Sequence, residues 1–252
     1  MRNIPAEMID APALSSESAL GRLARFPLRL VPPAMVVPVL TGKLRGRRWI
    51  AGSAINRCWL GLYEREKQEL ISQEVSRNTV FYDVGANVGF YSLLASALVG
   101  LGRVFAFEPA PRNLGYLRKH LELNSATNVE VLELAVSDKN GVTRFHVEPS
   151  GLMGHLSSDG AIRVPTATLD SLVVEGRILP PDYIKMDIEG AELLALHGAT
   201  ETVQRYRPVI FLATHSPEVH VECSRLLESW GYECTVLNGQ SSEIVARSKF
   251  QQ

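Results

Sequence analysis

Residues 80–91 constrain the fold more than any other part of the chain. Val80–Val84 is mostly apolar, with β-branched and aromatic residues, a composition typical of a buried strand. Gly85 ends this strand, and helical spacing of apolar residues begins after Asn87. A strand, a glycine turn and a helix in this order form the first unit of a doubly wound sheet, an α/β fold in which ligands bind beyond the carboxyl end of the strand.

The turn has the pattern Asp-x-Gly-x-Asn-x-Gly, formed by Asp83, Gly85, Asn87 and Gly89. Gly85 predicts a positive φ and a close ligand approach, and Gly89 predicts close helix–sheet packing. The pattern matches neither dinucleotide nor phosphate-binding loops, and it contains no lysine or arginine. S-adenosylmethionine fits because it carries an adenosine, a carboxylate and an ammonium but no phosphate, and Asp83 is placed to attract the ammonium. The alternative is a structural turn in another α/β protein.

A carboxylate at the end of the next predicted strand favours a nucleoside ligand. Glu108 follows the apolar residues 104–107 and lies nineteen residues after Gly89. At about this spacing, ~20 residues, a carboxylate accepts hydrogen bonds from ribose hydroxyls. Pro109 stops the strand directly after it. We expect both residues at the cofactor; the alternative for Glu108 is a solvated carboxylate.

A third strand is predicted over residues 129–136, with the adenine site at its end. By analogy with other doubly wound folds, Val136 and Ser137 would contact the adenine there. The assignment rests on position along the predicted sheet alone.

Composition places the chain among ordinary soluble proteins. It has 252 residues, 46% hydrophobic and 21% charged, enough for one large α/β domain. The three cysteines have no close-pair spacing, which argues against disulfides or zinc and suits a reducing cytoplasm. Residues 26–40 are apolar but too short and proline-rich to span a bilayer, and no signal-peptide pattern appears. We expect a cytoplasmic protein.

Charge divides the chain into a basic, proline-containing arm, residues 1–56, and a domain, residues 57–252. Residues 1–60 contain nine Lys/Arg and three Asp/Glu, although the net charge of the whole chain is only −1. A basic arm indicates an anionic partner, such as a membrane surface or an acidic glycan. The alternative, which we favour, is a solvated segment packed on the acidic domain.

The rest of the chain alternates strands and helices, with one interruption. Residues 140–168 read as a β insertion between the third and fourth strands, carrying a mobile Gly/Ser-rich loop at 150–158 near the site. Beyond it we expect strands at 182–187 and 209–212, helices at 191–197 and 219–230, and a closing hairpin of 233–237 with 243–246.

The motifs resemble the FkbM family of methyltransferases. The resemblance rests on residues 82–89, Phe107-Glu108-Pro109, the sequence Lys-x-Asp-x-Glu-Gly-Ala-Glu at 185–192, and Arg207-Pro208, and it covers about residues 57–237. It implies a Rossmann-like class I methyltransferase with a seven-stranded, mostly parallel sheet whose last strand is antiparallel. It also implies transfer of a methyl group from S-adenosylmethionine to a hydroxyl of a sugar, glycan or polyketide.

One position departs from the family pattern. Members often carry a glutamate in the strand after Arg-Pro, whereas this chain has Leu212, Ala213, Thr214 and His215. The role of that glutamate is therefore in question here, and His215 is the candidate to act in its place.

Three residues are candidates for catalysis, because an aliphatic hydroxyl needs help to lose its proton. Asp187 ends the fourth strand, where it would take the proton, hold the cofactor ammonium or bind a divalent cation. Glu189 has helix capping as its alternative role. His215 is a proton acceptor near neutral pH or a loop histidine with an ordinary hydrogen bond. Glu192 reads as structural, at a helix start.

Three further residues are candidates for the acceptor side of the site. Trp59 and Tyr63 would form a lid over the cofactor or pack in the core, and His155 would touch substrate or be exposed. No metal site is assigned, because the five-residue spacing of His215 and His220 does not suit zinc on one helix face.

The sequence leaves other activities open. A dehydrogenase would need Gly-x-Gly-x-x-Gly, which is absent. A nucleic-acid methyltransferase would need a basic face, whereas the predicted domain is acidic, so no nucleic-acid partner is expected. A protein that binds the cofactor without turnover, and oligomer formation, are compatible with the sequence.

Overall fold

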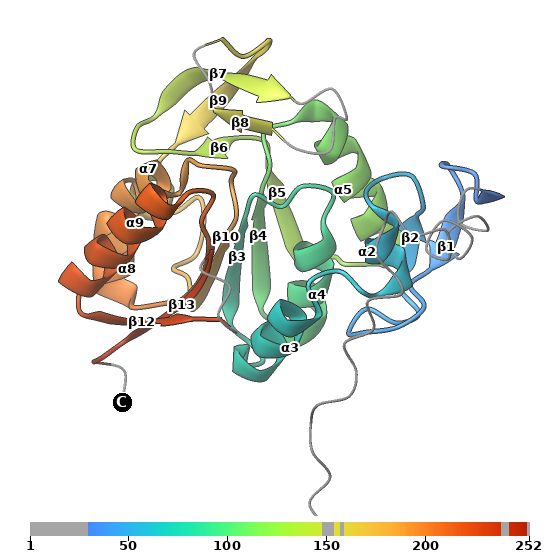
Figure 1. The fold of residues 1–252 in the computed structure, drawn as a ribbon, viewed down its shortest axis with the longest axis horizontal. Coiled ribbons are helices and arrows are strands. Elements are labelled where there is room, and N and C mark those ends of the chain that lie inside the picture. The colour runs from blue at the N-terminus through green and yellow to red at the C-terminus, as the bar shows by residue number, and fades with distance from the viewer. Residues whose placement is uncertain (1–29, 148–153, 157–158, 238–241, 251–252) are drawn as a thin grey trace, which may run out of the picture.

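The computed structural model describes residues 30–147, 154–156, 159–237 and 242–250. Within these residues seven strands form the main sheet (Figure 1). They are β3 (Val80–Val84), β4 (Arg103–Phe107), β5 (Val129–Leu132), β10 (Tyr183–Met186), β11 (Val209–Ala213), β12 (Tyr232–Val236) and β13 (Glu243–Ser248). Their order across the sheet is β12–β13–β11–β10–β3–β4–β5.

The strand directions confirm the predicted topology. The neighbours β5, β4, β3, β10 and β11 are parallel, β13 is antiparallel to β11, and β12 is antiparallel to β13. The last strand in sequence therefore lies inside the sheet, between β11 and β12. The closing hairpin is also confirmed, although its turn at 238–241 lies outside the described residues.

Helices cover both faces of the sheet, because the strand side chains alternate between two apolar cores. Phe81 packs in one core and Tyr82 in the other. The first core includes α3 (Arg65–Glu74), α4 (Phe90–Val99) and α5 (Pro111–Leu123). The second includes α6 (Leu169–Val174), α7 (Glu192–His197), α8 (Thr200–Tyr206) and α9 (Pro217–Ser229). The result is a three-layer α/β/α domain.

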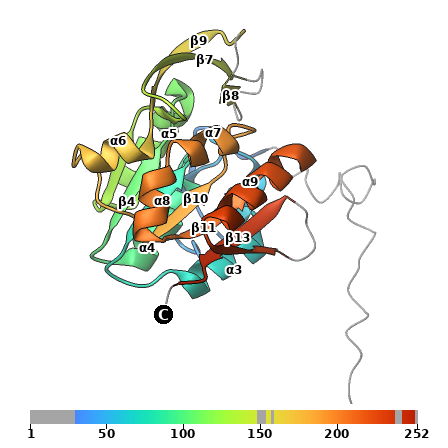
Figure 2. The same ribbon diagram turned by 90° about the vertical axis from the view of Figure 1, so that its left-hand side faces the viewer.

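The predicted β insertion is present as a separate small sheet between β5 and β10. Its strands are β6 (Ala135–Val136), β7 (Gly141–Val147), β8 (Gly154–Leu156) and β9 (Ile162–Ala167), in the order β6–β9–β7–β8. Figures 1 and 2 show it above one end of the main sheet, near α5 and α7. It roofs the side of the domain where ligands are expected.

Two boundaries within this region were predicted wrongly. The third strand ends at Leu132 rather than residue 136, because a tight turn, closed by the bond from the Leu134 N–H to the Leu132 carbonyl, passes the chain to the insertion. Residues 154–156 form a strand paired with β7, not part of a loop. The alternation of apolar and polar residues along the sequence indicates a strand, but it does not indicate to which sheet the strand belongs. Residues 150–153 and 157–158 of the predicted loop lie outside the described residues.

The described part of the N-terminal arm shares the core of the domain. It contains β1 (Val36–Pro38) and β2 (Arg48–Ile50), and α2 (Asn56–Leu60) begins at its last residue. Trp49, fully buried, stacks on His120 of α5 with ring centroids 3.9 Å apart. The Ile50 N–H donates to His120 Nε2 over 3.1 Å, and His120 Nδ1 donates to the Val88 carbonyl over 2.7 Å. The boundary at residue 56 stays a prediction.

The neutral state of His120 follows from its position. Burial lowers the pKa of His120 to about 4, so that the ring remains uncharged and Nε2 can accept the Ile50 N–H. Within the described ranges, no helix is long and apolar enough to cross a membrane.

Replacing Trp49 tests whether the arm stabilises the domain. Trp49→Ala leaves a cavity between β2 and α5, and we expect it to lower the free energy of unfolding by about 3–5 kcal/mol. Urea denaturation followed by circular dichroism measures this change. The control is Leu101→Ala, because Leu101 is 91% exposed and its loss is expected to matter little. Equal midpoints for both variants would show that the arm does not support the domain.

Candidate active site

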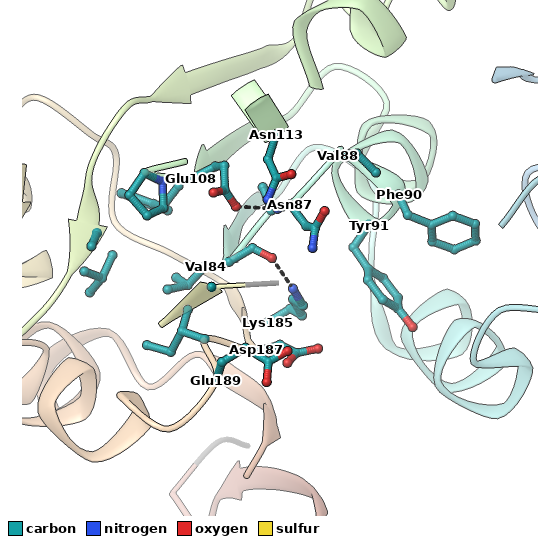
Figure 3. A pocket seen from close by; sticks show the side chains of 18 of the residues that line it. Val84, Asn87, Val88, Phe90, Tyr91, Glu108, Asn113, Lys185, Asp187 and Glu189 are labelled. Atoms are coloured by element: carbon teal, nitrogen blue, oxygen red, sulfur yellow. Dashed lines mark hydrogen bonds between the residues drawn. The ribbon is translucent and has the colours of Figure 1, made fainter. Parts of the chain in front are cut away.

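A cavity of about 290 Å³ lies at the carboxyl ends of β3, β4 and β10 (Figure 3). Its volume is close to the lower end of the ~300–1,000 Å³ typical of small-molecule sites. The residues predicted for the site that line it are Tyr63, Gly85, Asn87, Glu108, Pro109, Val136, Asp187 and Glu189. Residues from three strand ends, the insertion and α3's preceding loop thus meet at one cavity, as a doubly wound sheet requires.

Glu108 is the most firmly held carboxylate in this cavity. It is 4% exposed, and its Oε2 accepts the Asn87 N–H while its Oε1 accepts the Ala110 N–H, each over 2.8 Å. Burial raises the pKa of Glu108 to about 7, although these N–H donors and Asn113 act in the opposite direction. Two backbone donors fix the carboxylate and leave it able to accept further hydrogen bonds from a ligand.

The glycine turn supports the site through backbone geometry. Gly85 has φ +80°, as expected, and a Cβ there would lie 2.0 Å from the Asp187 carbonyl oxygen. The close neighbour of Gly85 is therefore the end of β10. Gly89, with φ +94°, does not line the cavity; a Cβ there would lie 2.6 Å from Leu117 Cδ1 of α5. Gly89 thus allows close packing of α5.

Asp83 lies behind the cavity wall. It is fully buried, accepts the Ser92 hydroxyl over 2.6 Å and lies 3.1 Å from Lys185 Nζ. Lys185 also donates to the Gly85 carbonyl over 2.8 Å. The charge of Asp83 is thus matched by a buried lysine, and Asp83 stabilises the turn from within. Its contact with a cofactor ammonium stays a prediction.

The predicted adenine region is partly at the cavity. Leu134, Ala135 and Val136 line it and give it an apolar wall. Ser137 is buried, its N–H donates to the Ala167 carbonyl and its hydroxyl to Asp138. Ser137 is not among the lining residues, so its side chain serves the insertion.

The aromatic residues near the site divide between cavity and core. Tyr63 lines the cavity and packs edge-on against Phe90, with ring centroids 5.2 Å apart. Trp59 is 5% exposed, packs in the core and bonds Asn56, so the core alternative holds for it. His155 lies on β8 beside His146, with ring centroids 5.2 Å apart; its contact with substrate stays a prediction.

Asp187 is held by lysines that the sequence did not single out for the site. Lys67 of α3 is 3% exposed, and its Nζ lies 2.9 Å from Glu243, 3.4 Å from Glu64 and 3.6 Å from Asp187 Oδ2. Burial alone would raise the pKa of Asp187, but Lys67 and Lys185, with His215, lower it below its ordinary value. Asp187 is therefore ionised at neutral pH.

His215 lies against three carboxylates at the ends of β10 and β11. Its Nδ1 bonds Glu192 Oε1 over 2.8 Å, and its Nε2 lies 3.4 Å from Asp187 Oδ1 and 3.4 Å from Glu189 Oε2. The hydrogen bond with Glu192 raises the pKa of His215 to about 9, although burial opposes it. Without another cation, the ring is charged at neutral pH. His215 is then a hydrogen-bond donor in this arrangement, and its role as a proton acceptor stays a prediction.

Two residues that sequence reasoning did not assign to the site hold it together. Lys67 carries no signal of a site role in the sequence, and the structure buries its ammonium among carboxylates. Glu192 is fully buried and accepts the N–H groups of Ile188 and Gly190. Its place at a helix start indicated a structural role, but nothing in the sequence signalled its bond to His215.

Fold and site together define a class I S-adenosylmethionine-dependent methyltransferase. The residues of the cavity suit an adenosyl group, because an apolar wall accompanies Glu108 in the lining. The glycine turn contains no lysine or arginine that would bind a phosphate. The fold resembles a methyltransferase FkbM from Methylobacillus flagellatus KT, with 20% identity and TM-score 0.52 over 68% of this chain and 44% of that one. It also resembles a precorrin-6y C5,15-methyltransferase from Geobacter metallireducens GS-15, with 20% identity and TM-score 0.50 over 74% and 89%.

The methyltransferase FkbM domain model matches residues 83–234, and the chain belongs to this family. Hexuronic acid methyltransferase AglP of Haloferax volcanii is 28% identical over 188 residues, 73% of this chain and 77% of AglP. The 2-O-methyltransferase NoeI of Sinorhizobium fredii is 29% identical over 162 residues, 56% of this chain and 65% of NoeI.

Replacing Lys67 tests the buried charge cluster. Lys67→Met leaves Glu64, Asp187 and Glu243 close together without their shared cation, so we expect a loss of about 3–5 kcal/mol in the free energy of unfolding. Chemical denaturation measures it. Lys43→Met is the control, because the Lys43–Glu69 pair is exposed and should contribute little. An unchanged denaturation midpoint for Lys67→Met would show that Lys67 does not stabilise the three carboxylates.

The raised pKa of Glu108 predicts how cofactor affinity depends on pH. A carboxyl with pKa about 7 is ~10% ionised at pH 6 and ~90% at pH 8, so a ribose held by the carboxylate should bind about tenfold more tightly at pH 8. Calorimetry with S-adenosylhomocysteine measures this, and Glu108→Gln should bind more weakly and lose this pH dependence. Identical profiles for both proteins would place the ribose elsewhere.

The same shift has a consequence for stability. The folded pKa lies above the ordinary value of 4.5, so the folded state binds more protons between these values. The contribution of Glu108 to stability is complete below pH 4.5 and is lost as the pH rises through about 7.

Proposed function

We propose that this methyltransferase transfers a methyl group to a hydroxyl oxygen of a sugar, a glycan or a similar hydroxylated small molecule. The observation that carries this is the position of Asp187 and Glu189 in the same cavity as Glu108. The carboxylates proposed for the acceptor side follow β10, and the carboxylate proposed for the nucleoside follows β4, with β3 between these two strands. The names of the relatives, one for a hexuronic acid and one for a 2-O position, agree with such an acceptor.

The cavity supports one orientation of the cofactor. The apolar residues Leu134 to Val136 would face adenine, and Glu108 would accept from the two ribose hydroxyls. The reacting end would then point toward β10, where Asp187 and Glu189 stand. Tyr63 and Tyr91 would close the side opposite the adenine wall. Holding both reactants in line in this way can contribute ~7–11 kcal/mol to lowering the barrier.

S-adenosylmethionine supplies a methyl group on a positively charged sulfur, which leaves with the bonding electrons when an oxygen attacks. Asp187 accepts the hydrogen of the acceptor hydroxyl and takes the proton as the oxygen–carbon bond forms. An alkylated hydroxyl is strongly acidic until that proton leaves, so even the depressed pKa of Asp187 makes it a sufficient acceptor. Glu189 offers a second acceptor for a neighbouring hydroxyl.

Neutralising Asp187 separates catalysis from binding. Asp187→Asn should lower the turnover number by ~10²–10⁴-fold while leaving S-adenosylhomocysteine affinity within about threefold of wild type. The assay measures S-adenosylhomocysteine released with a panel of uronic acids, neutral sugars and oligosaccharides. The control is Glu175→Gln, which neutralises an exposed carboxylate outside the cavity.

Each outcome of this assay has a clear meaning. Turnover with one acceptor class, lost in Asp187→Asn and kept in Glu175→Gln, supports the proposal. Cofactor binding without methylation of any panel member would favour a protein that binds the cofactor without turnover. Full activity of Asp187→Asn would remove Asp187 from proton transfer.

A further inference from the structure

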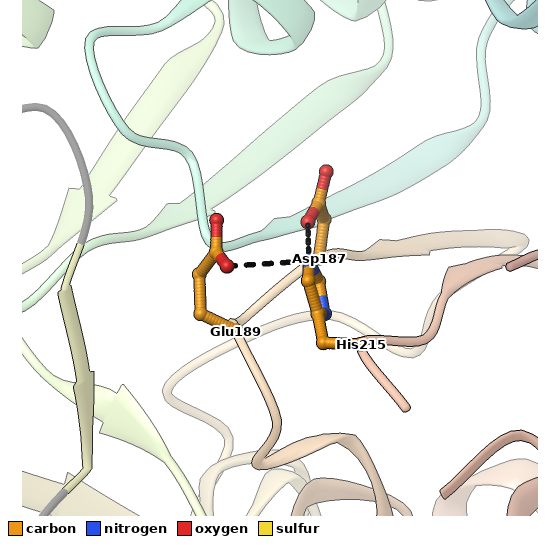
Figure 4. Close-up of side chains that lie close together, drawn as sticks. All are labelled: Asp187, Glu189 and His215. Carbon is orange, nitrogen blue, oxygen red and sulfur yellow. Dashed lines mark ion pairs between the residues drawn. The ribbon is translucent and has the colours of Figure 1, made fainter. Parts of the chain in front are cut away.

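Three side chains at the ends of β10 and β11 bring ligand atoms together beside the cavity (Figure 4). His215 Nε2 lies 3.4 Å from an oxygen of Asp187 and 3.4 Å from one of Glu189, and the three ligand atoms lie within 4.8 Å of one another. A cation with metal–oxygen distances of ~2.0–2.6 Å holds opposite ligands ~4–5 Å apart. The cluster therefore has the dimensions of a coordination sphere.

The imidazole is oriented from behind by a buried carboxylate. Glu192 is fully buried, and its Oε1 is fixed by the N–H groups of Ile188 and Gly190, over 3.3 and 3.0 Å, as well as by His215 Nδ1. Metal-binding histidines typically donate their second ring N–H to such a carboxylate, which directs the other nitrogen at the metal. This arrangement leaves Nε2 facing Asp187 and Glu189.

A second observation concerns a buried carboxylate oxygen behind the cluster. Among the described residues, Glu192 Oε2 is buried without a hydrogen-bond partner. Lys67 is shared among three carboxylates, and Lys185 lies against Asp83. At the Glu189 and Glu192 end of the cluster the contacting basic side chain is His215, and a metal ion would take the place of the proton on its Nε2. Buried negative charge in this position favours a bound cation.

We propose that Asp187, Glu189 and His215 bind a divalent first-row metal cation of the Mn²⁺ type, with Glu192 as the residue that positions His215. One imidazole and two carboxylates combine the ligand that suits Fe²⁺ and Co²⁺ with the ligands that suit Mn²⁺ and Mg²⁺. Asp187 Oδ2 remains directed at Lys67, which steadies the carboxylate while its other oxygen binds the metal.

The metal would also define the acceptor, an extension that rests on the function proposed above. Three protein ligands leave open positions on an octahedral cation, and two adjacent oxygens of a sugar, a hydroxyl with a hydroxyl or carboxylate, would fill two of them. The cation lowers the pKa of the bound hydroxyl. With Asp187 Oδ1 on the metal, the hydroxyl proton would pass to water instead of to Asp187 as the oxygen–methyl bond forms, and the sulfur would keep the electrons of the broken carbon–sulfur bond.

Manganese binding is measured directly on the full chain. Protein treated with EDTA and freed of chelator is titrated with MnCl₂, and the electron paramagnetic resonance signal of free Mn²⁺ reports binding. We expect one saturable site per chain. Glu189→Gln and His215→Asn should each weaken it at least tenfold, and Glu192→Gln by about tenfold. His197→Asn is the matched control, because His197 is an exposed histidine on α7, and it should bind as wild type does.

The Mn²⁺ affinities of the variants decide together whether the proposed site exists. Affinity unchanged in both His215→Asn and Glu189→Gln, or no saturable site in wild type, would overturn the proposal. If His215→Asn fails to fold by circular dichroism, Glu189→Gln decides, since its side chain is 34% exposed and its loss is tolerable for the fold. An equal effect of His197→Asn would also overturn it.

The metal and the reaction can fail separately. If EDTA-treated protein methylates a sugar at the full rate, the metal proposal fails and the proposed function stands. If Mn²⁺ binds at the three residues but no hydroxylated acceptor is methylated with or without it, the metal site stands and the proposed function fails.

Discussion

Gly85 lies so close to the end of β10 that a Cβ would be 2.0 Å from the Asp187 carbonyl oxygen. Lys185, from the same strand, donates to the Gly85 carbonyl and lies 3.1 Å from Asp83. The glycine turn and the strand that leads to Asp187 are thus joined by backbone contact and a buried ion pair. Any side chain at position 85 would push apart two halves of the cavity.

Local features of the chain were predictable, because their signals lie within a few residues. The strand, turn and helix around Gly85, the carboxylate Glu108 and the antiparallel last strand all appear as expected. Each depends on composition, spacing or a family motif in one segment. Where a segment changes partner without changing its periodicity, as between β5 and β6, the sequence carried no signal and the prediction was wrong.

The remainder of the site depends on distant pairs. Lys67 meets Glu243 across 176 positions of sequence, and Ile50 meets His120 across 70. From sequence alone, the ammonium group of a helical lysine such as Lys67 is expected in solvent. Only the fold shows that this ammonium is buried beside Asp187. The charge state of His215 likewise follows from Glu192, Asp187 and Glu189, which meet only after β10 and β11 are paired.

The positions of the charges around Asp187 give Lys67 and the proposed metal ion different tasks. Lys67 joins α3, β10 and β13, so it is fixed by the fold and cannot move toward an acceptor. Asp187 has one oxygen on each side, with Oδ2 toward Lys67 and Oδ1 toward His215. The lysine side keeps the carboxylate ionised and stationary, whereas the histidine side is partly exposed and is where the proposed metal ion or acceptor would exchange. The two oxygens of Asp187 thus face a cation that the fold fixes, Lys67, and the position proposed for a cation that can exchange.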